Sequence, residues 1–432
     1  MGKRFDVIVA GAGPAGATAA LRMAQKGLKV LVLERGDAPG AKNMFGGMLP
    51  GCPAAEELLA GFWDKAPWER HVVKRVLTII AQGSSTSLAF EADSYDHPPY
   101  NGYTLFRPVF DRWLAEQAVR AGATLLCSTV VQDLLRSGKK ITGVRTGRPQ
   151  GDIEAEAVVG CDGVLSFLAE KAGLRRPFTP SLMAVGVKGL FRMPEDLINE
   201  RFNLVRDQGA TCEFLGCTEG IRGGGFIYTQ TETLSAGLVF HLDALKQSGK
   251  APHEVFQRFL DLAPVRRLLK GARLVEYSAH VLPEGGYRMA PRLFTDGMLV
   301  AGDAAGLCYT NGLNQEGMNL AITSGVHAAD TICEAFERGD FSGKTLGHYD
   351  ARLRESFVLK DMKTFERAAE WMHTDRLFSV YPQVVGTALE EIYRSDGTPK
   401  RKIGRIGRDA LKGAVTVREL IADLVKGGRS LL

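Results

Sequence analysis

The sequence predicts an α/β protein in which a β-rich insert (an α+β region) interrupts a nucleotide-binding domain and a helical region follows. Three observations support this fold class. An apolar run, a Gly-rich turn and a helical pattern occupy residues 5–27, which is the order of a βαβ unit. Alternating, β-rich segments dominate residues 178–290, and a second buried-strand pattern returns at residues 297–306. We therefore expect 1–177 and 291–335 to form the nucleotide-binding domain, 178–290 to be the insert, and 336–432 to be helical.

The first turn has the residue spacing of a dinucleotide-binding site. Residues 7–10 read as a strand buried on both faces, and the turn that follows is Gly11-Ala12-Gly13-Pro14-Ala15-Gly16. In this pattern Gly11 permits a tight turn, Gly13 lets a phosphate approach the backbone, and Gly16 lets the next helix pack on the strand. Glu34 ends a second apolar strand about 20 residues further on, where a carboxylate binds a ribose hydroxyl. A dinucleotide is therefore the expected ligand.

The elements that follow continue this domain. A turn-rich segment after Arg35, residues 36–48, suits backbone that lies along a cofactor. Residues 72–90 read as strands, and a helix is expected from residue 106, with Arg107 and Pro108 near its start. A strand is predicted around residues 124–131, and a short strand ends in Asp162-Gly163.

The insert reads as an antiparallel sheet with helices over one face. Residues 183–193 and 223–242 alternate in the manner of strands, while 252–262 and 264–270 have helical patterns. A separate substrate domain is the expected role of this region. After it, a buried strand leads to Gly302-Asp303, and a loop through Gly312 leads to a long helix that starts near Gly317.

Composition narrows the classes of partner. The formal net charge is +5, and the basic residues are spread along the chain, so nucleic acid is not an expected partner. No signal peptide is recognised before the first strand, and no apolar run reaches membrane-spanning length. We expect a cytoplasmic protein, with peripheral contact to the cytoplasmic face of a membrane left open.

The cysteines and histidines predict no metal site. The seven cysteines are scattered and form no C-x-x-C pair, which argues against zinc and against an iron–sulfur cluster. Cys212 and Cys217 have the spacing of a flavoenzyme redox disulfide, but their place in the middle of the chain favours small buried side chains. The eight histidines show no ligand spacing and are interpreted as structural.

Three separated segments are expected to form one site. The glycine-rich turn with Glu34 would hold the nucleotide half of the ligand. Asp303 ends a strand, where its carboxylate could bind a ribityl hydroxyl or approach the pyrophosphate. The segment Gly317-Met318-Asn319 begins a helix whose positive end could face a ring that becomes anionic on reduction.

This order of motifs resembles the FAD-dependent family with the para-hydroxybenzoate hydroxylase type of fold, which includes geranylgeranyl reductases and flavin monooxygenases. A closer resemblance is to the electron-transfer flavoprotein:quinone oxidoreductases in their short FixC-type form. It rests on the segments at residues 40–47, 107–114, 223–229 and 302–308, and on 356–363 and Tyr381-Pro382 in the tail. The similarity extends nearly to the C-terminus.

The resemblance implies a Rossmann-like FAD-binding domain of the glutathione reductase/para-hydroxybenzoate hydroxylase type. The FAD is expected to be non-covalent, because no histidine or cysteine stands beside the nucleotide motifs in an attachment context. The resemblance also implies that Glu34 and Arg107 contact the adenosine and pyrophosphate, that Lys42 to Gly47 run along the flavin, and that the 312–319 turn caps its ring. The predicted cofactor-binding residues are Gly11, Ala12, Gly13, Pro14, Ala15, Gly16, Glu34, Arg35, Lys42, Asn43, Gly46, Gly47, Arg107, Val131, Asp162, Gly163, Gly302, Asp303, Gly312, Gly317, Met318 and Asn319. The catalytic residues are not predicted.

The implied reaction is an electron relay from an electron-transfer flavoprotein toward a quinone. Long members of the family carry a ferredoxin-like domain with four cysteine ligands, whereas this sequence has no cysteine after Cys333. A separate ferredoxin-like iron–sulfur subunit is therefore an expected partner. An isoprenoid-lipid (geranylgeranyl) reductase and a flavin-dependent monooxygenase remain alternatives. An apolar helical stripe at residues 404–426, flanked by basic residues, could dock on the protein's own core or on an anionic membrane.

Overall fold

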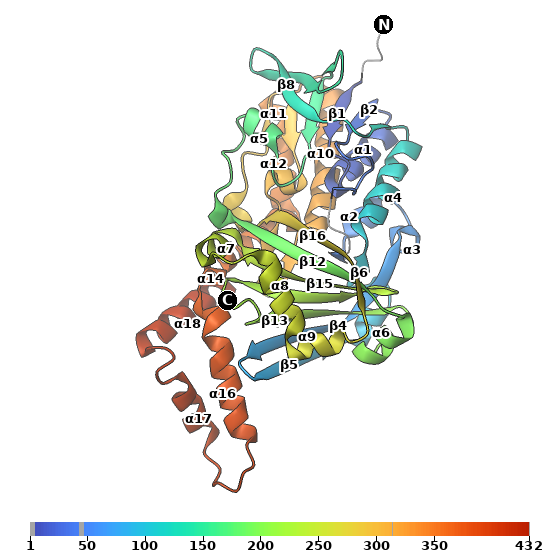
Figure 1. Ribbon diagram of the computed structural model, residues 1–432. Helices are drawn as coiled ribbons and strands as arrows, with labels where there is room; N and C mark the ends of the chain where they lie inside the picture. The colour runs from blue at the N-terminus through green and yellow to red at the C-terminus, as the bar shows by residue number, and fades with distance from the viewer. Residues whose placement is uncertain (1–4, 43–46, 313, 432) are drawn as a thin grey trace.

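The computed structural model describes residues 5–42, 47–312 and 314–431. A parallel sheet with its helices occupies one end of the molecule, a larger sheet lies in the middle, and the last helices extend from the opposite end (Figure 1). The fold is mixed α/β with a helical C-terminal region, as the sequence predicts.

The first sheet has six strands in the order β17-β18-β11-β1-β2-β7. All neighbouring strands are parallel except the β17–β18 pair. Its central strands are apolar and buried along their whole length, as expected for a parallel sheet covered on both faces. The strands are β17 (Phe294–Thr295), β18 (Met298–Val300), β11 (Ala157–Gly160), β1 (Val7–Ala10), β2 (Val30–Leu33) and β7 (Thr124–Leu126).

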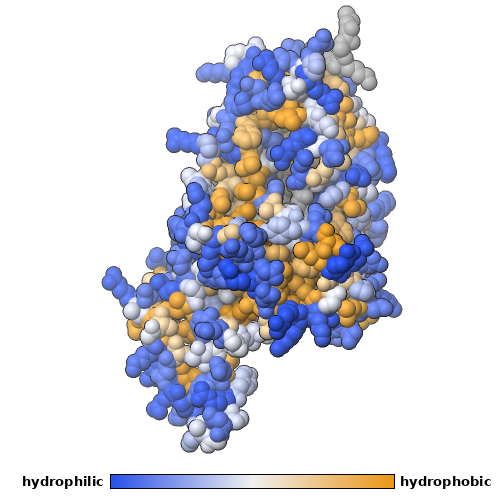
Figure 2. Space-filling view, in the orientation of Figure 1, coloured by the Kyte–Doolittle hydropathy of each residue, from blue (hydrophilic) through white to orange (hydrophobic). Residues whose placement is uncertain are grey.

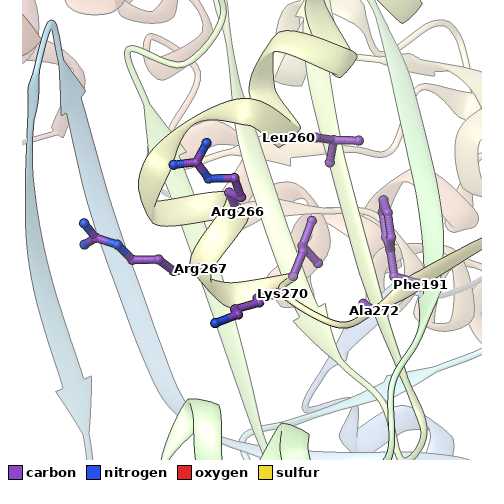
Figure 3. A pocket seen from close by; sticks show the side chains of 7 residues that line it. Phe191, Leu260, Arg266, Arg267, Lys270 and Ala272 are labelled. Carbon is purple, nitrogen blue, oxygen red and sulfur yellow. The ribbon is translucent and has the colours of Figure 1, made fainter.

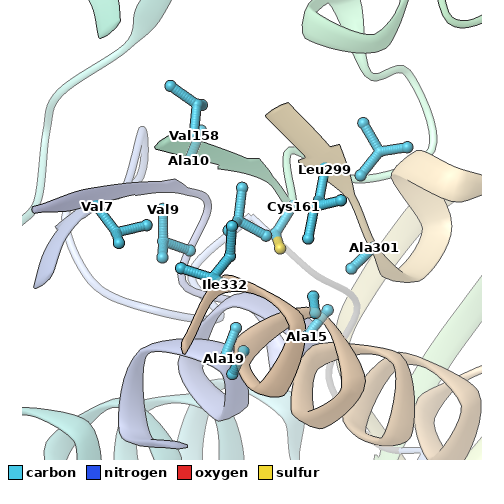
Figure 4. Packing of buried hydrophobic residues seen from close by; sticks show 14 of the residues in the cluster. Val7, Val9, Ala10, Ala15, Ala19, Val158, Cys161, Leu299, Ala301 and Ile332 are labelled. Atoms are coloured by element: carbon cyan, nitrogen blue, oxygen red, sulfur yellow. The ribbon is translucent and has the colours of Figure 1, made fainter. Parts of the chain in front are cut away.

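Helices α1 (Pro14–Gln25) and α10 (Met318–Arg338) cover this sheet on one face. Figure 4 shows Ala19 of α1 and Ile332 of α10 directed toward Val9 of β1, and all three are fully buried. The two helices cross closely, because a β-carbon on Gly325 would overlap the backbone carbonyl of Ala15. The N-termini of both helices are thereby held at one end of the sheet.

The second sheet has nine strands in the order β16-β12-β15-β14-β13-β4-β6-β3, with β5 paired to β4. It is antiparallel except for the parallel pair β13–β4. Strands between residues 47 and 105 belong to this sheet, although the sequence placed that region in the first part of the FAD-binding domain. The strands are β3 (Gly47–Pro50), β4 (Trp68–Ala81), β5 (Ser84–Glu91), β6 (Gly102–Leu105), β12 (Met183–Arg192), β13 (Gln208–Leu215), β14 (Gly223–Thr229), β15 (Thr233–His241) and β16 (Arg273–Pro283).

Helices cover one face of this second sheet, as the sequence predicts. Val187, Ile227 and Phe240 lie on that face and share a buried cluster with Val255 and Phe259 of the covering helix α8. The opposite face carries more polar side chains and contributes to the site described below. The covering helices are α6 (Glu195–Phe202), α7 (Leu242–Ser248), α8 (Pro252–Asp261) and α9 (Ala263–Leu268).

Smaller elements connect the two sheets. A three-stranded sheet of β8 (Val131–Ser137), β9 (Lys140–Thr146) and β10 (Asp152–Glu154) lies beside the first sheet. The predicted strand at 124–131 is divided, because Thr129 N–H donates to the Glu34 carbonyl at 2.8 Å and thereby bends the chain between β7 and β8. The connecting helices are α2 (Pro53–Leu58), α3 (Phe62–Lys65), α4 (Arg107–Arg120) and α5 (Phe167–Lys171).

The C-terminal region is helical. Its first part packs on the core of the first sheet through Tyr349, Leu353 and Val358. The predicted stripe at 404–426 forms two helices, α17 and α18, separated by residues 412–416. Within the part of the chain that the structure describes, no helix is long and apolar enough to span a membrane. The helices are α11 (Gly343–Leu346), α12 (His348–Glu355), α13 (Phe357–Thr364), α14 (Ala368–Met372), α15 (Arg376–Ser379), α16 (Tyr381–Tyr393), α17 (Ile403–Leu411) and α18 (Val417–Leu431).

Candidate functional site

The glycine-rich turn between β1 and α1 has the backbone that its sequence predicts. Gly11 has φ +105°, and a β-carbon there would overlap the carbonyl oxygen of Cys161. A β-carbon on Gly16 would overlap the carbonyl oxygen of Gly11. At Gly13, by contrast, a β-carbon would meet no described atom within 4 Å. The first and third glycines therefore permit close packing, whereas Gly13 faces open space in front of the helix.

The N-terminus of α1 is suited to an anion. Gly13 is the N-cap residue and provides no side-chain cap, Pro14 occupies the start of the helix, and the first turn has no acidic residue. The positive end of the helix dipole therefore faces the open space next to Gly13, where a phosphate would bind to the backbone N–H groups.

Glu34 holds the turn in shape. Its buried carboxylate accepts hydrogen bonds from Ala12 N–H (2.9 Å) and from Gly36 N–H (2.7 Å), one to each oxygen. A carboxylate oxygen has a second lone pair, so Glu34 can also accept from a ribose hydroxyl. The neighbouring Arg35 is exposed.

Arg107 lies at the start of α4 and is fixed by Asp111. Two parallel hydrogen bonds join them, from Nε to Oδ1 (2.8 Å) and from Nη2 to Oδ2 (2.9 Å), and the Asp111 side chain is fully buried. Gly40 (φ +81°) lies against this helix, since a β-carbon there would come 2.7 Å from the Arg107 carbonyl oxygen. The segment after Glu34 is thus packed against α4.

Asp303 lies in the short 3-10 turn η4 (Gly302–Ala305) that follows β18. Gly302 N–H donates to Ser324 Oγ of α10 at 3.0 Å, which ties this turn to the helix. Burial raises the pKa of the Asp303 carboxyl, and the nearby Arg107 guanidinium opposes that shift. One oxygen of Asp303 lies 4.0 Å from the β-carbon position of Gly317. Arg107, Asp303 and the start of α10 therefore converge.

The start of α10 closes the other side of this site. Its N-cap, Gly317, offers no side-chain cap, and the first turn has no acidic residue. Met318 contacts Gly47, with its Cε 3.5 Å from that glycine's β-carbon position. Asn319 donates from Nδ2 to Glu316 (2.7 Å), while its buried Oδ1 accepts no hydrogen bond from the described residues. Gly312, with φ +92°, lies in the preceding hairpin of β19 (Tyr309–Thr310) and β20 (Gln315–Glu316).

Other predicted residues have different surroundings. Asp162 accepts from Ser166 Oγ (2.5 Å) and Leu168 N–H (3.3 Å), so its side chain caps α5. Gly163 (φ +81°) faces open space next to the glycine-rich turn. Val131 begins β8 and packs on the core of the first sheet, and Lys42 is exposed. Asn43 and Gly46 lie outside the described residues.

Two basic residues of this site have no signal in the sequence. Lys188 of β12 and His280 of β16 lie on the polar face of the second sheet. Burial lowers the pKa of Lys188 to about 7, and Arg107 contributes to this shift. Burial also lowers the pKa of His280, as do the charges of Arg107, Arg35 and Lys188. Four basic groups from four separate segments therefore lie close enough to interact.

Two cavities of the molecule lie elsewhere. One of about 390 Å³ lies between β12 and helices α8 and α9, and in Figure 3 the charged ends of Arg266 and Arg267 point away from Phe191. Another of about 520 Å³ lies between α10 and α12. Neither is lined by a predicted site residue, and the first shows no converging polar groups.

The converging residues fit a dinucleotide cofactor. Two uncapped helix N-termini and a group of interacting basic side chains match a pyrophosphate and a ring that gains negative charge. The open position at Gly13 leaves room for the phosphate. Fold and site together define an FAD-dependent oxidoreductase, and residues 6–174 match the family model described as FAD dependent oxidoreductase.

The chain belongs to the electron transfer flavoprotein–quinone oxidoreductase (ETF-QO)/FixC family. Residues 368–432 match the family model of the ETF-QO/FixC C-terminal domain. Over 429 residues the chain is 39% identical to the probable electron transfer flavoprotein-quinone oxidoreductase YdiS of Escherichia coli (strain K12), covering 99% of both chains. It is 40% identical to protein FixC of the same strain, covering 98% of both. The family and the FAD cofactor implied by the sequence are thereby confirmed.

Solved structures share the fold at low identity. A geranylgeranyl bacteriochlorophyll reductase-like protein of Thermoplasma acidophilum has a TM-score of 0.74 at 19% identity, with 98% of this chain and 99% of that chain covered. The flavin-dependent brominase Bmp2 has a TM-score of 0.63 at 16% identity, with coverage of 99% and 98%. These similarities confirm the predicted architecture.

Proposed function

We propose that this protein accepts electrons from an electron-transfer flavoprotein and passes them toward a quinone. The observation that carries this proposal is the convergence of the glycine-rich turn, Arg107, Asp303 and the α10 N-terminus, in a chain about 40% identical to FixC and YdiS. FAD supplies the electron-transfer chemistry when bound. The protein's task is then to hold the cofactor and to adjust its electrostatic surroundings.

Each part of the site has a separate proposed role. The turn at residues 11–16 and the N-terminus of α1 bind the pyrophosphate, and Glu34 binds the ribose hydroxyl. Arg107, positioned by Asp111, and Asp303 contact the pyrophosphate or the ribityl chain. The N-terminus of α10 faces the ring and favours negative charge there. Predicted contacts from Arg35, Lys42, Asn43, Gly46, Gly47, Val131, Asp162, Gly163 and Gly312 complete the set.

Lys188 is the proposed proton donor and acceptor of this site. Reduction of a quinone to a quinol consumes protons as well as electrons, so a group that titrates near neutral pH is useful beside the flavin. Lys188 is buried on the sheet face next to the Arg107 cluster, with a pKa of about 7. Its Nζ also lies 5.8 Å from the ring centroid of Phe226, an aromatic neighbour on the same face.

A separate ferredoxin-like iron–sulfur subunit is the proposed second electron carrier. A four-iron cluster takes about four cysteine ligands. Among the residues that the structure describes, no cysteine belongs to a group of three or more that could hold a metal. The basic segment formed by α17 and α18 suits an acidic partner, because opposite charges accelerate association.

Purification of the chain alone and together with its partners tests the relay. We expect the isolated chain to contain one FAD and no iron or acid-labile sulfide. Addition of the reduced electron-transfer flavoprotein should reduce the flavin, and efficient quinone reduction should require the ferredoxin-like subunit. Stoichiometric iron in the isolated chain, or full quinone reductase activity without that subunit, would contradict the proposed division of labour.

A second assay separates this function from the alternatives. A monooxygenase or a lipid reductase that takes hydride directly from a nicotinamide should bleach its flavin rapidly when NADPH is added. The proposed relay should not do so, yet it should respond to the reduced partner flavoprotein in the same cuvette. Rapid bleaching by NADPH alone would argue for one of the alternatives.

A further inference from the structure

Two histidines and an aspartate gather where the second sheet meets the C-terminal helices. His241 is the last residue of β15, Asp243 lies in the first turn of α7, and His373 directly follows α14. One potential ligand atom from each of these side chains lies within 4.8 Å of the others. These residues come from two regions about 130 positions apart in the sequence, and none of them belongs to the FAD site.

Two buried polar atoms at this place lack hydrogen-bond partners. His241 is only 2% exposed, and its Nε2 makes no hydrogen bond to the described residues. Glu284, which directly follows β16, has an Oε2 that also lacks a hydrogen-bond partner among the described residues. The other Glu284 oxygen lies 3.4 Å from His241 Nε2. Buried polar atoms are nearly always paired in folded proteins, so these two unpaired atoms are available to a ligand.

The two imidazoles lie beside one another and beside a carboxylate. A neutral imidazole presents a lone pair on one nitrogen. The rings pack edge to face with their centroids 4.7 Å apart, and Asp243 supplies a carboxylate beside them.

The surroundings position the aspartate. Arg222 donates from Nη2 to Asp243 (2.6 Å) and from Nη1 to Asp375 (2.8 Å), while Ala244 N–H donates to the other Asp243 oxygen (2.8 Å). Such hydrogen bonds to a ligand carboxylate are the usual support of a metal site. Two carboxylates, Asp243 and Asp375, and two cations, Arg222 and Lys426, lie near the two imidazoles.

We propose that His241, Asp243 and His373 bind a divalent metal of the zinc class. Two imidazoles and one carboxylate are a donor set that Zn²⁺ accepts in tetrahedral sites, with a fourth position left for water or a further carboxylate. Glu284, whose Oε1 lies 3.4 Å from His241 Nε2, is the candidate carboxylate for that position. Because His373 follows α14, the metal ties the C-terminal helices to the second sheet. This assignment replaces the interpretation of these two histidines as purely structural.

Metal titration of the full-length, FAD-loaded protein tests the site. After treatment with a chelator, the protein should take up one Zn²⁺ per chain by calorimetry and elemental analysis. His373→Ala and, separately, Asp243→Asn should abolish this uptake and leave the FAD content unchanged. His348→Ala is the matched control, since His348 is a partly exposed histidine of the same region that pairs with Glu334 outside the cluster.

Hydrogen exchange provides a readout that does not depend on enzyme activity. Zn²⁺ should slow amide exchange in α7 and α14 of the native chain and of His348→Ala, but not of His373→Ala. Absence of zinc uptake by the native chain would overturn the proposal. So would unchanged uptake by both His373→Ala and Asp243→Asn. If one variant loses FAD through misfolding, the other decides the question.

Discussion

Gly13 tests the assignment of the phosphate site at the scale of a single residue. A side chain there meets no described protein atom within 4 Å, so Gly13→Asp should fold normally. Its carboxylate would, however, lie where we propose that the pyrophosphate binds, and such like-charge contacts cost several kcal/mol. We expect this variant to lose its FAD, as measured by absorbance of the purified protein.

Gly404→Asp is the control, because it adds the same side chain at an open position of α17. It should retain one FAD per chain. Full flavin content in Gly13→Asp would show that the pyrophosphate binds elsewhere.

Lys188 gives a pH-dependent prediction. The unfolded chain keeps the lysine proton up to its ordinary pKa of 10.5, whereas the folded FAD-free protein releases it at a pKa of about 7. Between these values the unfolded state binds more protons, so this residue makes stability rise with pH, by up to about 1.4 kcal/mol per unit. Below pH 7 its full destabilising effect is present.

Lys188→Met removes that dependence. We expect the variant to be more stable than the native FAD-free protein at about pH 6.5, with the difference shrinking toward about pH 9 in urea denaturation. A difference that stays constant over this range would mean that Lys188 keeps its proton.

At the scale of elements, the buried carboxylate of Asp423 binds α18 to α15. Arg376 donates two hydrogen bonds to Asp423, at 2.7 and 2.9 Å, and Tyr381 donates a third at 2.6 Å. These bonds hold the pKa of Asp423 below its usual value. These hydrogen bonds therefore contribute their full stabilisation at pH values above the pKa that Asp423 has in the unfolded chain. The contribution is lost as the pH falls through the lower pKa of Asp423 in the folded protein.

Asp423→Ala should release α18 locally. Loss of hydrogen bonds to a charged group costs about 1–3 kcal/mol, so amide exchange in α18 should accelerate while that in β1 stays slow. Asp409→Ala in α17, an exposed carboxylate paired with Arg401, is the control. If amide exchange accelerated equally in α17 and α18, and did so in both Asp423→Ala and Asp409→Ala, the result would indicate general unfolding.

The same helix presents an apolar face to solvent. Val417, Ile421, Leu424 and Val425 are 46–75% exposed, whereas Ile406 of α17 is buried on its neighbours. Apolar residues lie among hydrophilic ones over these helices in Figure 2. The sequence left open whether this stripe docks on the protein or on a membrane, and the exposed half favours the second proposal for α18.

Charge on that face should weaken membrane contact. We expect the double variant Ile421→Glu/Leu424→Glu to float less with anionic liposomes than the native chain, because both side chains are more than half exposed. Val205→Glu, an equally exposed apolar position in the second sheet domain, should leave flotation unchanged. Unchanged flotation of the double variant would exclude α18 as the contact.

At the scale of the whole molecule, positive charge gathers at the C-terminal end. The last 33 residues contain three acidic residues and nine basic ones: Lys400, Arg401, Lys402, Arg405, Arg408, Lys412, Arg418, Lys426 and Arg429. Attraction between this end and an acidic ferredoxin-like subunit is screened by salt, with a Debye length of about 8 Å at 0.15 M. The rate of electron transfer to that subunit should therefore fall steeply as ionic strength rises.

Replacement of Arg405 and Arg408 by Gln should flatten this salt dependence, while Lys139→Gln and Lys140→Gln, in the distant β8–β9 turn, should preserve it. A rate that is insensitive to salt in the native protein would argue against docking at this end.

Much of the first sheet could be predicted from the sequence, because each strand and turn is defined by residues next to one another, as in Val7 to Gly16. The second sheet could be predicted only in part. Strand β4 pairs with β13, about 140 residues later, and local patterns carry no information about such a partner. Lys188 and His280 were missed for the same reason, since each is a single polar residue in a strand and gains meaning only beside Arg107.

The close crossing of α1 and α10 fixes the distance between the two helix N-termini that we propose bind the phosphates and the flavin ring. Gly325 lies directly on the backbone of Ala15, with no side chain between them, so the two helices cannot shift independently. The two helix N-termini are therefore held at a fixed separation. A side chain at position 325 would push the two helices apart, and we expect it to weaken FAD binding although every residue proposed to touch the cofactor would be unchanged.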